Sequence, residues 1–326
     1  MRHLLSRKLS LRMAFASLSA ALCLNATPSF SQEVVKIVVG YPPGSATDNI
    51  ARLVAEKMTA VSGKRYIIDN LSGASGNVGA AAVARAPGDG ATILLTSDNP
   101  ITTNIHLFKS IGFDPLKDLK PITIAANNII ALAVHPSLPA NSVEELIAYA
   151  KENPGKLHFA SSGVGSPHHL AGEQLKSMAS IDLGHVPYKG GGPALSDLAG
   201  GHVQVAFSSI SGAIPLAEAD RIRLLAVTEP ERYAALPDVP AMAETLPGYV
   251  MSSWIGYFAP GSTPDDLVAE LNGTIAKALQ DKDLKERLLA MGLIPVANSP
   301  EDARQVVIAD LELRGNLVRD SGATLD

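Results

Sequence analysis

The sequence predicts an α/β protein, because short apolar runs alternate with capped helices along most of the chain. Most of these runs are continuous and β-branched, which is typical of parallel strands covered by helices on both faces. Small polar loops follow several of them, as expected at the carboxyl edge of such a sheet. The expected strands are Val34–Val39, Tyr66–Asp69, Ala91–Thr96, Ile129–Val134, Leu157–Ala160, Leu183–Val186, Val203–Phe207 and Ile222–Val227.

Helix starts carry recognisable capping signals. Ser142–Glu145 reads as a capping box that opens a helix over Val143–Asn153. Thr263–Asp266 supplies a cap, a first-turn proline and two acids ahead of apolar residues at helical spacing. Ser299–Asp302 repeats that pattern for the last helix, so the C-terminal part is rich in helix.

Residues 1–31 have the pattern of a secretory signal peptide. Four basic residues precede an apolar run, Met13–Leu24, which is too short to span a membrane. Small residues before Gln32 predict cleavage near Ser31–Gln32. Cys23 is the only cysteine, so the mature chain is expected to have no disulfide and no thiol nucleophile. This combination favours a bacterial periplasm.

The charge balance argues against nucleic acid as a partner. Of 27 Lys and Arg residues, four lie in the leader, which leaves 23 against 32 Asp and Glu and a mature net charge of −9. An anionic ligand would therefore have to be held by local dipoles. The mature length suits two domains, and we expect a soluble protein that acts as a monomer.

Two segments predict a chain that crosses twice between two lobes. Near Ile122–Val134 two apolar runs are joined only by Asn127 and Asn128, and near Ile222–Val227 a single run leads into a polar segment. If both are crossings, residues 128–228 form an inserted second lobe, and residues 32–127 together with 229–326 form the first lobe. Lobes joined in this way can hinge and close on a ligand.

The loops after the strands predict binding of a small anion. Free backbone N–H groups, small hydroxyls and the positive end of a helix dipole together favour a carboxylate or phosphate. The loops that combine these features are Pro42–Asp48, Gly73–Asn77, Ser97–Pro100, Ser161–Pro167 and Lys189–Pro193.

The first loop, Pro42–Asp48, offers close backbone approach at Gly44 and hydroxyls at Ser45 and Thr47. Thr47 could instead merely cap the following helix, expected over residues 48–61. Asp48 is better suited to capping or bracing the loop than to touching an anion, because a carboxylate repels one. Tyr41 could line the ligand cleft or simply pack against the fold.

In the second loop, Ser161, Ser162 and the N–H groups of Gly163 and Gly165 could hold a carboxylate, with Ser166 as helix cap. The alternative is an ordinary strand-to-helix turn.

The histidines and aromatic residues are better explained by structure than by chemistry. Adjacent helical residues diverge too far for His168 and His169 to chelate together, so we expect surface or helix-start histidines and no metal site. His185 is expected to lie beside a strand without a partner. Trp254 and Tyr257 are expected to be core aromatics near the hinge, with contact to the cleft as the alternative.

Common catalytic and cofactor motifs are missing. The sequence contains no G-x-S-x-G, H-E-x-x-H or phosphate-binding G-x-x-x-x-G-K-[ST] pattern. We therefore predict no catalytic residues, no cofactor and no enzymatic activity.

Taken together, the loops resemble the tripartite tricarboxylate transporter substrate-binding proteins, also called Bug receptors. The resemblance covers essentially the whole mature chain, in order. It is carried by Tyr41–Gly44 with Thr47 and Asp48, Asp69–Asn70, Gly76–Gly79, Ala86–Gly90, Val134–Pro139, Ser161–Ser166, His169–Glu173, His185–Gly190, Pro193–Leu195, Asp197–Leu198, Leu225–Thr228, Ala259–Pro260 and Thr263–Pro264.

This resemblance implies a periplasmic receptor with the two-lobed type II binding-protein fold, a hinged "venus flytrap". It also implies delivery of organic acids to a membrane permease made of one large and one small subunit. The first-lobe Pro-Gly loop and the second-lobe Ser-Ser-Gly loop would hold the ligand carboxylate, often through water, with Ser97 at the same edge. The implied contacts are Pro43, Gly44, Ser45, Thr47, Ser161, Ser162, Gly165 and Ser166.

The sequence departs from the family pattern in two places. The first loop has Ser45 and Ala46 where the family commonly has a further glycine, which makes the loop stiffer. Ser208 stands where many members have an acid; if that acid contacts the ligand or its waters in relatives, Ser208 would change the preference at the distal end of the ligand. Aromatic acids, short dicarboxylates and acidic amino acids all remain candidate ligands. A receptor that presents its ligand to a sensor, or a secreted hydrolase or lyase, are the alternative functions.

Overall fold

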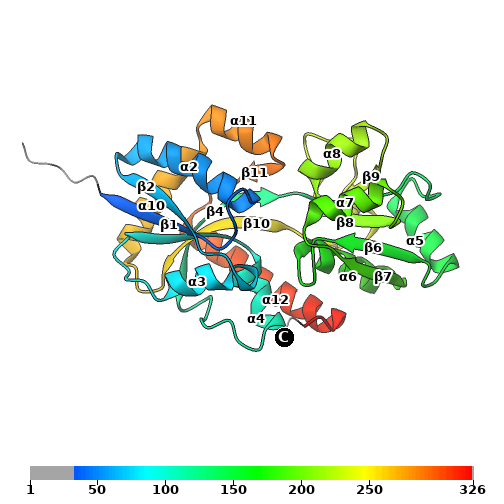
Figure 1. Cartoon of the computed structure of the whole chain (residues 1–326), viewed down its shortest axis with the longest axis horizontal. Helices are drawn as coiled ribbons and strands as arrows, with labels where there is room; N and C mark the ends of the chain where they lie inside the picture. Colours follow the sequence, from blue (N-terminus) through cyan, green and yellow to red (C-terminus); the bar gives the residue numbers. More distant parts are fainter. Residues whose placement is uncertain (1–32, 325–326) are drawn as a thin grey trace, which may run out of the picture. The chain divides into compact units, whose positions relative to one another are not determined.

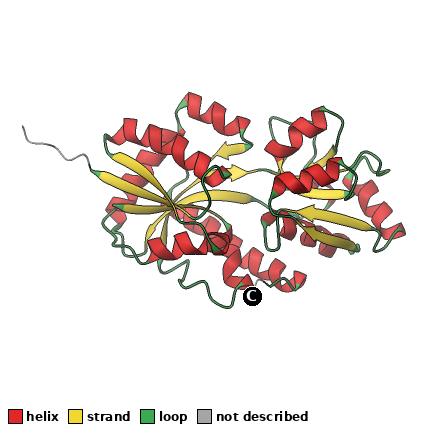
Figure 2. Cartoon of the chain, in the orientation of Figure 1, coloured by secondary structure: helices red, strands yellow, loops and turns green. Residues whose placement is uncertain are grey.

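The computed structural model describes residues 33–324, which form two β-sheets flanked by helices (Figures 1 and 2). The predicted leader, its cleavage point and Cys23 lie outside the described residues. Within residues 33–324, no helix combines the length and the apolar character that crossing a membrane requires.

The six-stranded sheet has the order β11-β4-β10-β3-β1-β2. Strand β1 lies parallel to β2 on one side and β3 on the other, while β10 is antiparallel to both β3 and β4, and β11 is antiparallel to β4. Its strands are β1 (Val34–Val39), β2 (Arg65–Asn70), β3 (Thr92–Ser97), β4 (Leu119–Asn128), β10 (Ser253–Pro260) and β11 (Leu293–Pro295).

The five-stranded sheet has the order β7-β6-β8-β5-β9. Strand β6 is parallel to β7 and β8, whereas β5 is antiparallel to β8 and β9. Its strands are β5 (Ile130–Val134), β6 (Leu157–Ser161), β7 (Leu183–Pro187), β8 (Val205–Ser209) and β9 (Arg223–Val227).

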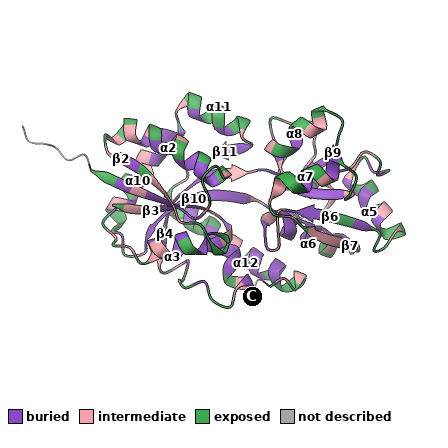
Figure 3. Ribbon diagram, viewed as in Figure 1, coloured by how far each residue is buried: buried purple, intermediate pink, exposed green. Residues whose placement is uncertain are grey.

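Helices connect and cover these strands, and the buried residues concentrate on the strands and on the helix faces turned toward them (Figure 3). They are α2 (Ala46–Ser62), α3 (Asn77–Ala84), α4 (Asn104–Leu107), α5 (Val143–Glu152), α6 (Pro167–Ala179), α7 (Gly191–Ala199), α8 (Ile210–Glu218), α9 (Met242–Thr245), α10 (Asp265–Leu279), α11 (Lys282–Ala290) and α12 (Pro300–Ser321), with single turns η1 (Ala74–Gly76) and η2 (Asn99–Thr103).

The expectation that the strands are parallel is wrong for β5, and β10 is missing from the strands expected from the sequence. Both strands are buried along their whole length and run against their neighbours. Continuous apolar character records burial on both faces and carries no information about strand direction. Trp254 and Tyr257 are buried side chains of β10, so their prediction as core aromatics is confirmed.

Capping follows the sequence at most helix starts. The hydroxyls of Ser142 and Ser299 accept hydrogen bonds from the N–H groups of Glu145 and Asp302, as predicted. Thr263 does not cap α10: Pro264 occupies the cap position, and the buried Thr263 hydroxyl has no partner among the described residues.

The core of the second sheet extends beyond the strands themselves. Met242, Tyr249 and Met251 pack in the same apolar cluster as Phe159 and Leu132, and the Tyr249 hydroxyl donates to the Ala171 carbonyl at 2.8 Å. The packing of this sheet therefore reaches past residue 228, where the inserted lobe was expected to end.

Helix α12 contributes to the cores of both sheets. Ala303 and Val307, near its start, pack with Trp254 in the core of the first sheet, whereas Leu317 and Val318, near its end, pack with the core of the second. The two ends of this helix therefore pack in different cores.

Arg314 lies between these two parts of α12 and is completely buried. Its guanidinium lies 3.0 Å from an Asp98 carboxylate oxygen and 2.9 Å from an Asp310 oxygen, and it also donates to the Ser252 carbonyl. Arg314 thus ties α12 to the end of β3 and to the start of β10.

Glu229 belongs to the same polar cluster. Its carboxylate accepts a hydrogen bond from the Ser252 hydroxyl at 2.7 Å. Burial raises the pKa of Glu229 to about 7, and the Ser252 hydroxyl and the charge of Arg314 only partly offset this rise. Asp98 after β3, Glu229 after β9, Ser252 before β10 and Arg314 of α12 therefore meet in one largely buried polar cluster.

We expect Arg314→Met to lower the free energy of unfolding by about 3–5 kcal/mol, because it strands the buried carboxylates of Asp98 and Asp310 without a cation. Urea denaturation followed by circular dichroism measures this loss. Arg319→Met, the same change at an exposed position of α12, is the control and should cost less than about 1 kcal/mol. Equal losses in both variants would contradict a special role for the cluster.

Candidate functional site

The predicted site residues fall at the carboxyl ends of neighbouring parallel strands in each sheet. Tyr41 follows β1 and Ser97 ends β3, and the two hydroxyls are 2.6 Å apart. In the other sheet, Ser161 ends β6 and Ser208 lies near the end of β8. Such edges are where open α/β sheets bind ligands.

Tyr41 is half-buried and packs beside the core of the first sheet. Burial raises the pKa of Tyr41 to about 12, with the Ser97 hydrogen bond acting in the opposite direction. The phenol is therefore neutral at ordinary pH. This geometry supports the packing interpretation and leaves Tyr41 close to the edge that Ser97 also lines.

Asp48 braces the first loop from inside. Its buried carboxylate accepts hydrogen bonds from the Gly44 N–H at 2.8 Å, from Arg52 at 2.9 and 3.0 Å, and from the Asn70 amide at 3.0 Å. Burial raises the pKa of Asp48, but these donors outweigh burial and lower it overall. Gly44 has φ of +82°, a left-handed conformation that lets its N–H turn back to this carboxylate.

The free donors of the first loop differ from those expected. The Gly44 and Ser45 N–H groups are already bonded, to Asp48 and to the Pro42 carbonyl. Ser45, not Thr47, caps α2, because its hydroxyl accepts from the Asp48 N–H at 3.2 Å. This leaves the N–H groups of Ala46 and Thr47, which occupy the first two helical positions and have no acceptor inside the helix.

The second loop is also largely satisfied by its own neighbours. The buried Ser161 hydroxyl lies 2.7 Å from His185 Nε2 and 3.1 Å from the Gly163 N–H that donates to it. The Gly165 N–H donates to His169 Nδ1 at 3.1 Å, and Ser166 caps α6. The expectation that Gly163 and Gly165 present free N–H groups is therefore wrong.

The histidines around this loop are buried, which corrects the expectation of surface residues. His168 and His169 do stand at the start of α6, but they are 8% and 4% exposed. His185 is not without partners: it bonds Ser161 and stacks on His169 with ring centroids 3.9 Å apart. Burial lowers the pKa of His168 and of His185 to about 4, and the charge of His169 contributes at His185.

Sequence reasoning missed these histidines as loop supports. Their backbone positions were visible in the sequence, but their partners depend on how β6, β7 and α6 pack. Within residues 33–324, no three His, Cys, Asp or Glu side chains gather closely enough to hold a metal ion.

The two predicted loops lie in different sheets, and among the described residues no hydrogen bond joins Pro43–Thr47 to Ser161–Ser166. The segment after β3 does approach the second loop. A Cβ atom placed on Gly165 would lie 2.2 Å from a Leu107 methyl group, and Gly165 has φ of +73°. Gly165 therefore permits close packing against Leu107 of α4, in addition to shaping its own loop.

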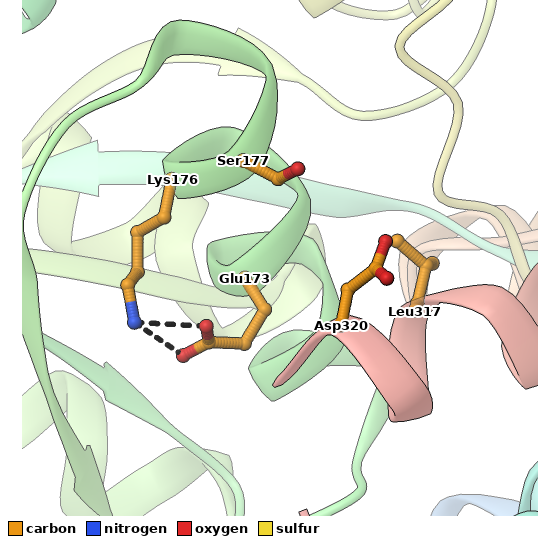
Figure 4. Close-up of a pocket in the computed structure, with 5 residues that line it drawn as sticks. All are labelled: Glu173, Lys176, Ser177, Leu317 and Asp320. Carbon is orange, nitrogen blue, oxygen red and sulfur yellow. Dashed lines mark hydrogen bonds and ion pairs between the residues drawn. The ribbon is translucent and has the colours of Figure 1, made fainter. Parts of the chain in front are cut away.

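A cavity of about 310 Å³ lies between α6 and α12, away from the predicted site residues (Figure 4). Lys176 bonds both carboxylate oxygens of Glu173, at 2.9 and 2.8 Å, and Asp320 faces the cavity from α12. Because the two carboxylates of Glu173 and Asp320 outnumber the single ammonium of Lys176, this cavity is unsuited to binding an anion.

Comparison with known proteins places these observations in a family. The model described as "Tripartite tricarboxylate transporter family receptor" matches residues 50–323. Protein BugT of Bordetella pertussis is 33% identical over 317 residues, which covers 96% of each chain.

Solved structures agree with this match. The chain is similar to R. palustris Rpa4515 with adipate, at 36% identity and a TM-score of 0.79, over 91% of this chain and 100% of that one. It is also similar to the periplasmic binding protein BugD, at 31% identity and a TM-score of 0.74, over 89% of this chain and 98% of that one. A third similar structure is MatC of Rhodopseudomonas palustris with bound malate, at 29% identity and a TM-score of 0.74, over 89% of this chain and 100% of that one. These likenesses confirm the predicted fold class.

We expect Asp48→Ala to lower the free energy of unfolding by about 1–3 kcal/mol, because the Gly44 and Asn70 donors lose the buried carboxylate that accepts from them. Asp69→Ala is the matched control: its ion pair with Lys36 is exposed and should contribute less than about 1 kcal/mol. Urea denaturation of both variants makes the comparison. A cost no larger for Asp48→Ala than for Asp69→Ala would show that the loop does not depend on this carboxylate.

Proposed function

Because the chain belongs to the tripartite tricarboxylate transporter receptor family, we propose that it captures a small organic carboxylate in the periplasm and delivers it to a membrane permease. The permease would consist of one large and one small subunit. The observation that carries this proposal is the pair of bound ligands, adipate and malate, in the similar proteins Rpa4515 and MatC. The expected secretory leader and the name of BugD as a periplasmic binding protein support the location.

The ligand would lie between two lobes, one formed by residues 32–127 with 229–326 and the other centred on residues 128–228. Each lobe would be built on one of the two sheets. Closure would be favoured by contacts that the ligand makes only when both lobes reach it. The segments that meet at Arg314 would form the pivot of that motion.

In the first lobe, the free N–H groups of Ala46 and Thr47 and the dipole of α2 would hold the carboxylate. The Thr47 hydroxyl, which has no hydrogen-bond partner within residues 33–324, would add a donor. Pro43, Gly44, Ser45 and Asp48 would set the shape of this loop. Tyr41 and Ser97 would lie nearby, at the same edge of the first sheet. In the second lobe, Ser162 would donate to the ligand, while Ser161, Gly165 and Ser166 would shape the loop. Ser208, near the end of β8, would lie close to this loop.

An enzymatic role receives little support from Ser162 and His168, a pair that could suggest one. Ser162 Oγ lies 2.6 Å from His168 Nδ1, which resembles a nucleophile beside a base. The other ring nitrogen has no orienting partner among the described residues, and burial lowers the pKa of His168 to about 4. A base this weak would activate a hydroxyl poorly.

The proposal predicts that organic acids, but not their amides, stabilise the protein. A thermal-shift screen should include aromatic acids, short dicarboxylates and acidic amino acids, each beside its amide. A ligand at a hundredfold excess over its Kd should add about 2.7 kcal/mol of stability. If no carboxylate shifts the melting temperature, the proposed function is wrong.

With a ligand identified, Thr47→Ala combined with Ser162→Ala should weaken binding by about tenfold or more, because each change removes a donor to the carboxylate. Isothermal titration calorimetry measures the affinity, and unfolding of the free protein checks that the fold survives. The matched control is Ser196→Ala with Thr274→Ala, whose hydroxyls bond only their own helices. Unchanged affinity in the first double variant would move the site elsewhere.

A further inference from the structure

The three serines of the second loop differ in what their hydroxyl protons can do. Ser166 Oγ donates to the Gly163 carbonyl at 2.7 Å, and Ser161 Oγ donates to the same carbonyl at 3.2 Å. Both protons therefore remain inside the loop. Ser162, which is half-buried, bonds only the ring of His168 among the described residues.

The direction of the Ser162–His168 hydrogen bond decides whether Ser162 can donate a hydrogen bond to an anion. If His168 Nδ1 carries the proton, it donates to Ser162 Oγ, and the Ser162 proton is free to point outward. If Nδ1 carries no proton, Ser162 donates its own proton to the ring. Its oxygen then presents only lone pairs to a ligand, and these repel a carboxylate.

The buried side of the ring favours the first arrangement. His168 Nε2 is buried and has no partner within residues 33–324. A proton on Nε2 would leave a buried N–H without an acceptor, and orphaned buried donors are rarer in proteins than under-satisfied acceptors. The low pKa of His168 keeps the ring neutral, so only one nitrogen carries a proton.

We propose that His168 is a positioning residue that keeps its proton on Nδ1, donates to Ser162 Oγ and thereby directs the Ser162 hydroxyl proton at the ligand carboxylate. This inference rests on the proposed function. It makes the loop favour acceptor groups, because the Ser162 proton is then free to donate to the ligand instead of being used on the His168 ring.

The first test is the tautomer of His168. Long-range ¹H–¹⁵N correlation spectra of the mature chain, assigned with a His168→Asn sample, should show a protonated Nδ1 and a bare Nε2. A proton on Nε2 would overturn the proposal, and this readout requires no ligand.

The second test compares two substitutions at His168, with binding of the acid found in the screen as the readout. His168→Leu fills the buried space without a donor and should weaken binding about five- to tenfold. His168→Asn places an amide N–H near the position of Nδ1 and should bind within about threefold of wild type. Thermal unfolding of each variant verifies that it is folded.

A double-mutant cycle separates positioning from packing. In a Ser162→Ala background, His168→Leu should cause no further loss of affinity, because the hydroxyl that it orients is gone. Additive losses, or no rescue by asparagine, would mean that His168 only fills space. If wild type binds no acid, the proposed function fails and the inference with it; if wild type and His168→Leu bind equally, the inference alone fails.

Discussion

The fold depends on one buried guanidinium that holds segments far apart in the sequence. Arg314 pairs with Asp98 at the end of β3 and with Asp310 one turn earlier in α12, and it bonds the backbone just before β10. Removing so many polar groups from water is unfavourable unless they satisfy one another. The cluster therefore holds α12 against the end of β3, where Ser97 of the candidate site lies, and against the start of β10.

Scarcity of free donors is the main feature of the candidate site. Most polar groups in the two loops bond within the loop or to a supporting side chain, such as Asp48 or His185. These internal bonds hold the loops in one conformation before a ligand arrives, which limits the entropy lost on binding. In the proposed function, the few donors that remain, at the start of α2 and at Ser162, would carry most of the recognition.

Much of the fold could be predicted from the sequence, because apolar runs and capping residues are local signals. Strand β10 was missed because it starts with Ser253 and Gly256 interrupts its apolar pattern, and the direction of β5 cannot be read from hydrophobicity. The site loops were recognised as segments, but not the state of their hydrogen bonds. The Gly165 N–H is not free because it donates to His169, and His185 has a partner because Ser161 lies beside it. Such pairings form only when the chain packs, so they cannot be read from the sequence.

The interleaving of early and late strands also constrains the order in which the chain can fold. The five-stranded sheet uses strands from one continuous stretch, Ile130 to Val227, so its strands can pair before the rest of the chain has folded. The six-stranded sheet cannot close until β10, near the end of the polypeptide, inserts between β3 and β4. Early strands such as β3 must wait with an unpaired edge, which is the situation in which chaperones protect a nascent protein from aggregation.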